Sequence, residues 1–284
     1  MSRRKNVKRE CNICGEITCL TDDHVPPQGC GNCSPISSYK FFDVMAEIKP
    51  VSHIRQRGIT FRTLCSKCNN EILGGLYDKE LIGVSDALAT FLVSNTILPR
   101  IVELKCKPDM LSRAIIGHVL ASKTYYEDRF THELEMRRFF QNPQIIRPES
   151  LKLFIWPYPY GGIELIRDVF IKDLSHSVDS LNGLGSIIKF YPIAYAIGDY
   201  NDVHGLVNLF DYTSEDISQE VVIPLNLGAL FMTNGVIRPN TWPDRYSDNT
   251  ILFGTKGTDD SVVAQRYISH SLRNSIQEDL SKQD

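Results

Sequence analysis

Cys11-Asn12-Ile13-Cys14-Gly15 and Cys65-Ser66-Lys67-Cys68 are the two stretches that decide how the first part of this chain can fold. Each C-x-x-C turn presents two thiolates from one tight loop, and two such turns complete the four-sulfur shell of a structural zinc. Seven of the eight cysteines fall before residue 69, and such crowding in a reducing compartment indicates metal binding rather than disulfides. We therefore expect one Zn²⁺ to be held by Cys11, Cys14, Cys65 and Cys68.

A rival pairing exists. Cys30-Gly31-Asn32-Cys33 is a third C-x-x-C, and its distance from Cys14 also suits a zinc ribbon. Spacing alone does not choose between the two arrangements. The residues beside each pair favour the first arrangement, which leaves Cys30 and Cys33 as free thiols in a loop.

Each chosen cysteine pair is followed along the chain by residues of types that are common in catalytic and metal sites. Asp23-His24-Val25-Pro26 follows the first pair, and Asn69 directly follows the second. This order resembles the HNH endonucleases, also called ββα-metal nucleases, in the subgroup braced by four cysteines. The continuation Asn69-Asn70-Glu71-Ile72-Leu73-Gly74-Gly75 is similar to the ending of one branch of that family. The resemblance covers roughly residues 10–85, and its motifs are specific in combination.

The resemblance implies a metal-dependent DNA endonuclease. It assigns His24 as the general base, and neutral imidazole can accept a proton from water near pH 7. It assigns Asp23 and Asn69 as oxygen ligands of a catalytic Mg²⁺ or Mn²⁺, the kind of ligand that hard cations take. In the family these two ligands lie on a β-hairpin and on the short helix after the second cysteine pair. A closed four-cysteine zinc is not catalytic, but it would fix the distance between them.

One position departs from the family pattern. The Asn that braces the loop of the catalytic His normally lies nine residues before the last ligand, and here that position is Thr60. A threonine hydroxyl could take over the bracing, or another residue could carry it.

Positive charge gathers in the same part of the chain. Residues 1–107 hold 15 Lys+Arg and 11 Asp+Glu, whereas residues 108–284 hold 16 and 23. Clustered positive charge supplies sequence-independent affinity for a polyanion. We therefore expect DNA as the partner of the N-terminal part, with Arg55, Arg57 and Arg62 as phosphate contacts. The acidic remainder argues against a second surface that grips DNA.

The sequence predicts an α+β protein with three parts. An N-terminal zinc-braced ββα-metal domain covers residues 1–85, a helical connector covers 86–142, and a mixed, strand-rich accessory domain of unknown role covers 143–284. Apolar spacing predicts helices over Tyr77–Ile97, Pro108–Tyr126, Thr131–Phe140 and Asp260–Lys282. Residues rich in Ile, Val, Phe and Tyr predict strands over Leu151–Tyr158, Ile163–Ile171, Ile187–Ile197, Val221–Leu225 and Thr250–Phe253.

Composition and charge exclude several other classes of protein. A formal charge of −3 over 284 residues excludes a uniformly basic nucleic-acid coat protein. No apolar run approaches the roughly 18 to 20 residues of a membrane helix, and the N-terminus lacks the apolar segment of a secretory signal. We therefore expect a cytoplasmic protein with no membrane partner. By analogy, such nucleases act in bacterial restriction or anti-phage defence, where the accessory domain would bind a protein partner or mediate homo-oligomers.

Two other functions fit the same cysteines. A non-catalytic zinc module that binds nucleic acid or a protein partner would need the zinc but not His24. A zinc hydrolase of small molecules would need an open position on the zinc, which a four-thiolate shell does not offer.

Overall fold

The computed structural model describes residues 8–40, 53–94, 99–126, 131–159, 162–171, 181–227 and 250–252. These residues form a mixed α+β fold with three sheets, as predicted. In the part of the chain that is described, no helix has the length and apolar composition needed to cross a membrane.

The two cysteine pairs lie at one end of a three-stranded antiparallel sheet. Its strands are β1 (Lys8–Glu10), β2 (Ile17–His24) and β5 (Thr60–Cys65), in the order β1-β2-β5. The first pair lies in the turn between β1 and β2, and the second begins at the end of β5. A helix of wide π-type turns, η2 (Lys67–Tyr77), follows and runs into α2 (Asp78–Ser94). The local order is therefore hairpin, cysteine pair, helix, which is the order that the resemblance implied.

The largest sheet joins strands from both ends of the chain. Its order is β11-β7-β10-β9-β8-β13-β3-β4. Five of these strands are β7 (Lys152–Pro157), β8 (Glu164–Ile171), β9 (Gly183–Phe190), β10 (Ile193–Tyr200) and β11 (Val207–Asn208). The others are β13 (Thr250–Leu252), β3 (Ile36–Lys40) and β4 (His53–Arg55). A separate ribbon pairs β6 (Ile101–Cys106) with β12 (Val221–Asn226).

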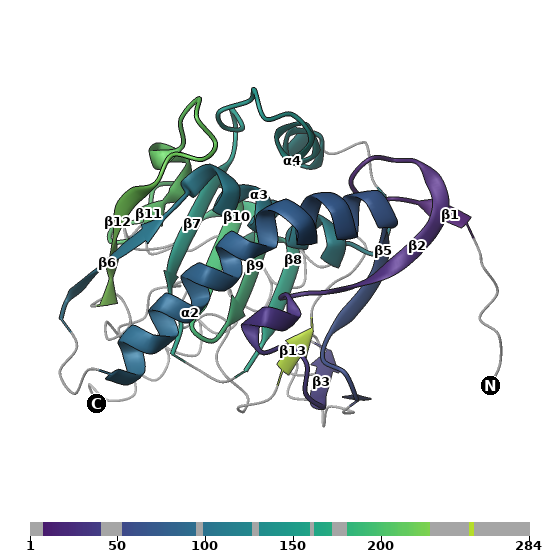
Figure 1. Cartoon of the computed structure of the whole chain (residues 1–284), viewed down its shortest axis with the longest axis horizontal. Helices are drawn as coiled ribbons and strands as arrows, with labels where there is room; N and C mark the ends of the chain where they lie inside the picture. The colour runs from purple at the N-terminus through teal and green to yellow at the C-terminus, as the bar shows by residue number, and fades with distance from the viewer. Residues whose placement is uncertain are drawn as a thin grey trace, which may run out of the picture.

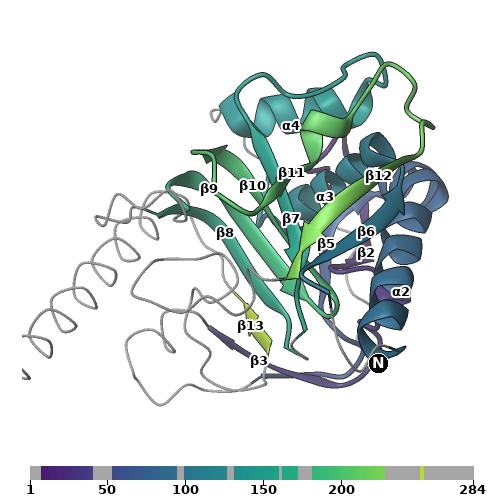
Figure 2. The ribbon, with the colours of Figure 1, turned by 90° about the vertical axis from the view of Figure 1, so that its left-hand side faces the viewer.

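Helix α3 (Pro108–Ser122) lies at the centre of the molecule. Figures 1 and 2 show it between α2 and the large sheet, with α4 (Thr131–Gln141) across one end of the layers. Every residue of α3 except Met110 is buried. Apolar spacing predicted this helix, and its burial on all sides arises because α3 has a neighbour on every side.

One hydrophobic cluster extends from Cys11 to Leu227. It includes residues of the zinc hairpin, of α2 and α3, and of the large sheet. Strands β3 and β4, which belong to the predicted N-terminal part, also join the large sheet with strands of the predicted accessory domain. The predicted boundaries at residues 85 and 142 therefore do not mark gaps in the core.

Two predicted elements need correction, and strand β6 was missed. The strand expected over Ile187–Ile197 is a hairpin, because Pro192 lies in the turn between β9 and β10. The helix from Pro108 ends at Ser122 rather than at Tyr126. Strand β6 was not predicted, although its alternation of exposed and buried residues is a strand pattern. The helix expected over Asp260–Lys282 lies outside the described residues.

Candidate metal and catalytic site

The four predicted cysteines come together. The Sγ atoms of Cys11, Cys14, Cys65 and Cys68 lie within 4.8 Å of one another. Among the described residues this is the one group of three or more Cys, His, Asp or Glu side chains close enough to share a metal. The cluster could hold a Zn²⁺ with four thiolate ligands.

Backbone amides and burial tune the four sulfur atoms. The Cys65 amide donates to Cys11 Sγ at 3.3 Å, and the Cys68 amide donates to Cys65 Sγ at 3.4 Å. A hydrogen bond from the Cys68 thiol lowers the pKa of Cys11 to about 4, whereas burial raises the pKa of Cys14 to about 11. The cluster therefore favours a single thiolate, at Cys11, which is stabilised by hydrogen bonds from its neighbours. A bound divalent cation would allow the remaining three thiols to ionise as well.

The rival pair is placed elsewhere. Cys30 ends the short 3-10 helix η1 (Gln28–Cys30) and contacts Ser85 Oγ of α2 at 3.5 Å. Burial raises the pKa of the Cys30 thiol to about 12, and Cys33 is exposed. No metal group among the described residues includes either thiol.

The second cysteine pair brings Asn69 against strand β2. The Asn69 side-chain amide donates to Thr21 Oγ1 at 2.9 Å and to the carbonyl oxygen of Asp22 at 3.1 Å. Both bonds use the amide nitrogen, so the amide oxygen is left for another ligand. Asn70 faces away and donates to Ser66 Oγ. Asn69 is thus held against the strand that carries Asp23.

Asp23 and His24 end strand β2 on opposite sides of the pleat. Asp23 is buried and His24 is half-buried. His24 Nε2 lies 3.0 Å from the carbonyl oxygen of Arg57, which can only accept a hydrogen bond. Nε2 therefore carries the proton in the neutral ring, and the lone pair is on Nδ1. The exposed Gln28 amide lies 3.1 Å from the same Nε2, and rotating that amide by 180° would present its oxygen as a second acceptor.

Thr60 pairs directly with His24 across the hairpin, but Asn32 braces the loop that follows His24. The Asn32 amide nitrogen donates to the carbonyl oxygens of Pro26 and Ile59, at 2.7 and 3.0 Å, and its oxygen accepts the Ile59 amide at 2.7 Å. Gly58 has a φ of +77°, and a Cβ there would lie 2.3 Å from Asn32 Oδ1. Of the two alternatives at this position, the structure therefore favours the second, because Asn32 of the third C-x-x-C braces the loop.

Helix α3 brings a histidine to Asp23 that the sequence did not predict at the site. His118 is fully buried, with Nε2 at 2.8 Å from Asp78 Oδ1 and Nδ1 at 3.5 Å from Asp23 Oδ2. Burial by itself lowers the pKa of His118, but the charges of Asp78 and Asp23 outweigh burial and raise the pKa to about 10. The His118 imidazolium thus lies between two carboxylates and attracts both.

The sequence motifs place neither His118 nor Asp78 among the candidate site residues. Asp78 begins α2, and its carboxylate also binds His118. His118 lies 95 positions after Asp23 in the chain, and no local spacing links them. The sequence feature that could have indicated its role is a histidine among the regularly spaced apolar residues of the helix, because that helix is buried on all sides.

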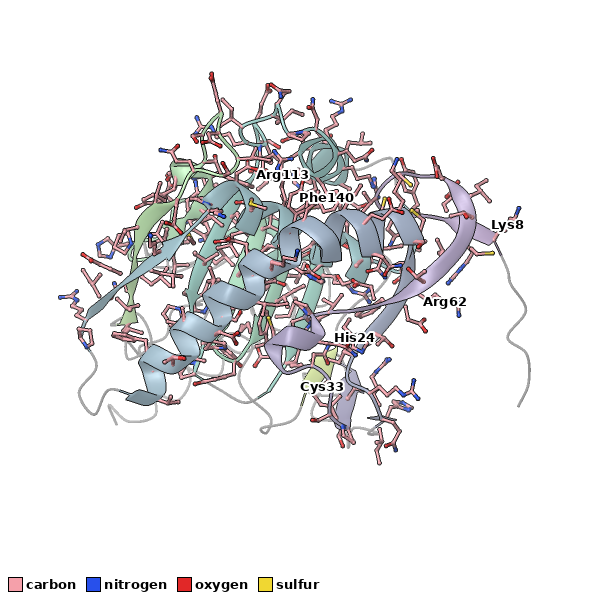
Figure 3. The ribbon with its side chains drawn as sticks, in the orientation of Figure 1. Lys8, His24, Cys33, Arg62, Arg113 and Phe140 are labelled. Atoms are coloured by element: carbon pink, nitrogen blue, oxygen red, sulfur yellow. The ribbon has the colours of Figure 1, made fainter. Side chains whose placement is uncertain are left out.

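The three predicted arginines differ in placement. Arg62 on β5 donates from Nε to the carbonyl oxygen of Leu20 at 2.8 Å. Arg55 on β4 donates to Ser38 Oγ at 3.3 Å, and the Arg57 side chain is exposed beside the His24 contact. Among the ion pairs of the described residues, none neutralises these three. Figure 3 shows Arg62 and His24 on the same hairpin.

Comparisons of the chain with protein-family models, with curated proteins and with solved structures found no match.

Proposed function

We propose that this protein is a metal-dependent DNA endonuclease of the HNH type, with a structural zinc on Cys11, Cys14, Cys65 and Cys68. The observation that carries the proposal is the contact of Asn69 with β2 beside Asp23 and His24. Asn69 is more than forty positions from Asp23 and His24 in the chain, and its side chain bonds Thr21 and Asp22 of the strand that carries both of them.

The residues present fit a hard divalent cation. Asp23 Oδ2 is buried and has no hydrogen-bond partner among the described residues, although His118 lies within ion-pair distance. The Asn69 amide oxygen adds a neutral donor, and both are ligand types that Mg²⁺ and Mn²⁺ prefer. When bound there, the cation would supply positive charge against the charge that develops on phosphate oxygens.

His24 carries the proton transfer. The Arg57 carbonyl oxygen holds Nε2–H, so Nδ1 accepts a proton from water as the water oxygen bonds to phosphorus. The bond from phosphorus to the 3′ oxygen breaks on the opposite side, and that oxygen leaves with a solvent proton. The products are a 5′ phosphate and a 3′ hydroxyl. Asn32 keeps the loop after His24 in place, which preserves the direction of Nδ1.

The zinc cluster positions both halves of this site. Cys65 and Cys68 fix the start of η2 and therefore Asn69, whereas Cys11 and Cys14 hold the turn that leads into β2. The four thiolates would close the zinc shell, so this metal acts by positioning residues and not by activating water.

Nicking of supercoiled plasmid with Mg²⁺ or Mn²⁺ tests the proposal. We expect wild type to nick and His24→Ala to lose at least a hundredfold in rate, because general base catalysis contributes about 10²- to 10⁴-fold. His53→Ala is the matched control, since His53 is an exposed histidine on β4. If His24→Ala and His53→Ala nick as well as wild type, or if wild type is inactive, the chain is better described as a non-catalytic zinc module.

A further inference from the structure

A pocket of about 350 Å³ lies between strands β1, β2 and β5 and the residues that follow α3. It is separate from the Asp23 and His24 site, and neither residue lines it. Its walls combine the basic side chains of Lys8, Arg9 and Arg62 with the rings of Tyr125 and Tyr126.

The pocket is positively charged, and its cations are held in place. Glu10 is the one acidic residue in its lining, against three cations. Arg9 Nη2 donates to the carbonyl oxygen of Arg62 at 2.7 Å, and Arg62 Nε donates to the carbonyl oxygen of Leu20 at 2.8 Å. Carbonyl oxygens orient a guanidinium without neutralising it. Both arginines therefore keep donors and charge for an anion such as a phosphate.

The opposite wall is aromatic. Tyr125 is 48% exposed, and Tyr126 lies under the Arg137 guanidinium, which is 4.1 Å from the ring centre. Tyr126 also packs against Gly15 of the first cysteine turn, where a Cβ would come within 3.3 Å of the ring. Tyr126 is therefore a fixed part of the wall, and Tyr125 offers the open ring face.

The first cysteine turn also holds the backbone of this wall. Asn12 donates its side-chain amide to the carbonyl oxygens of Leu120 and Lys123, at 3.1 and 2.9 Å, just before the two tyrosines. Arg137 donates to the carbonyl oxygen of Asn12 at 2.8 Å. The pocket is thus built on the same zinc turn that positions the nuclease hairpin.

The pocket lies along the strand that carries His24. Leu20 lines the pocket and precedes His24 by four residues, about 13 Å of extended strand. Figure 3 shows Lys8, Arg62 and His24 following one another along the hairpin.

We propose that this pocket binds an unstacked nucleotide of single-stranded DNA, next to the strand being cut, with its base on Tyr125 and its phosphates at Arg9 and Arg62. Aromatic rings bind any unpaired base through its face, whereas paired bases in a duplex hide theirs. This inference rests on the proposed nuclease function, because it names DNA with an unpaired stretch as the preferred substrate of that nuclease.

Binding can be measured on the full-length His24→Ala protein, in which we expect cleavage to be at least a hundredfold slower. Fluorescence anisotropy would compare a labelled oligothymidylate with a labelled duplex of the same length. We expect Tyr125→Leu to weaken binding of the single strand by roughly fivefold to a hundredfold and to leave duplex binding unchanged. Tyr125→Phe keeps the ring and should bind as the parent does.

Salt dependence tests the phosphate contacts. We expect Arg9→Ala and Arg62→Ala each to reduce the slope of log affinity against log salt by about 0.7 on the single strand. Arg138→Ala is the matched control, since Arg138 is exposed on α4 and does not line the pocket. Its slope should equal that of the parent.

Equal single-strand affinity of Tyr125→Leu and the parent would overturn the proposal, as would a parent that binds only duplex. Tighter binding of oligouridylate than of oligothymidylate would assign the pocket to RNA and also overturn it. None of these results tests the proposed nuclease function. That proposal is refuted only if plasmid nicking does not depend on His24.

Discussion

Replacing His118 by Gln tests the least expected contact at the site. His118 lies fully buried between Asp78 and Asp23, at 2.8 and 3.5 Å. Gln has a similar volume and can still donate one hydrogen bond to a carboxylate, but it carries no charge. The substitution therefore leaves two carboxylates near each other in the interior without the cation between them.

The expected loss of stability follows from the pKa of His118. That pKa rises from 6.5 to about 10 on folding, and each unit corresponds to about 1.4 kcal/mol. Together with the usual loss when one partner of a buried pair is removed, we expect His118→Gln to lower the free energy of unfolding by about 3 to 5 kcal/mol. A group with a raised folded pKa stabilises fully below its unfolded pKa. The contribution should therefore be complete near pH 6 and lost as pH rises toward 10.

Urea unfolding at several values between pH 6 and 10, with zinc retained and no other divalent metal added, measures this contribution. The difference between wild type and His118→Gln should shrink steadily as pH rises. Ser112→Ala, a buried uncharged change on the same helix, should give a difference that does not change with pH. A constant gap for His118→Gln would falsify the assignment of an imidazolium. In the nicking assay, we expect His118→Gln to need roughly 10- to 100-fold more Mg²⁺ for half-maximal rate.

The remaining predictions concern the zinc, the loop after His24 and the cysteines. Cys65→Ser should lose the bound zinc in metal counting, whereas Cys30→Ser should keep it, and equal zinc content in both would refute the pairing. Asn32→Ala removes three hydrogen bonds to buried backbone groups, of which the Ile59 carbonyl oxygen keeps a bond from the Val25 amide, so we expect a loss of about 2 to 4 kcal/mol in urea unfolding and a slower nicking rate. Gly58→Ala should have a similar effect, because its Cβ would meet Asn32 at a positive φ. Iodoacetamide at pH 8, followed by mass spectrometry, should label Cys19 and Cys33 well before Cys30, because burial raises the pKa of Cys30 to about 12.

The parts of the site that the sequence predicted are those that short motifs specify. A C-x-x-C turn fixes two sulfur atoms through local geometry, so the clustering of Cys11, Cys14, Cys65 and Cys68 followed from two motifs and is confirmed. The contact of Asn69 with β2 followed in turn, because Asn69 directly succeeds a ligand. Helix starts at Pro108 and Thr131 were also correct, since proline at a first helical position and apolar spacing are local signals.

The residues that long-range packing brings in were not predictable in this way. Asn32 replaces Thr60 as the brace because the loop over residues 25–35 folds back onto Ile59, and nothing in the Cys30-Gly31-Asn32-Cys33 motif specifies that contact. Pro192 lies in the turn between β9 and β10, but the apolar residues on both sides of it predicted one continuous strand. The position of β3 and β4 beside β13 depends on strand pairings across the whole chain, for which a single sequence carries no local signal.

The buried position of α3 explains why the chain is so much longer than its motif. On one side α3 supplies His118 to Asp23, and at its end the carbonyl oxygens of Leu120 and Lys123 accept hydrogen bonds from Asn12 of the first cysteine turn. Its other sides pack against α2, α4 and the large sheet, so the free energy that keeps α3 in place comes mostly from residues beyond 85. A fragment ending at residue 85 would lack both the cation beside Asp23 and the support of the zinc turn. The helical connector, and the residues that bury α3 within it, are therefore a structural requirement of the candidate site.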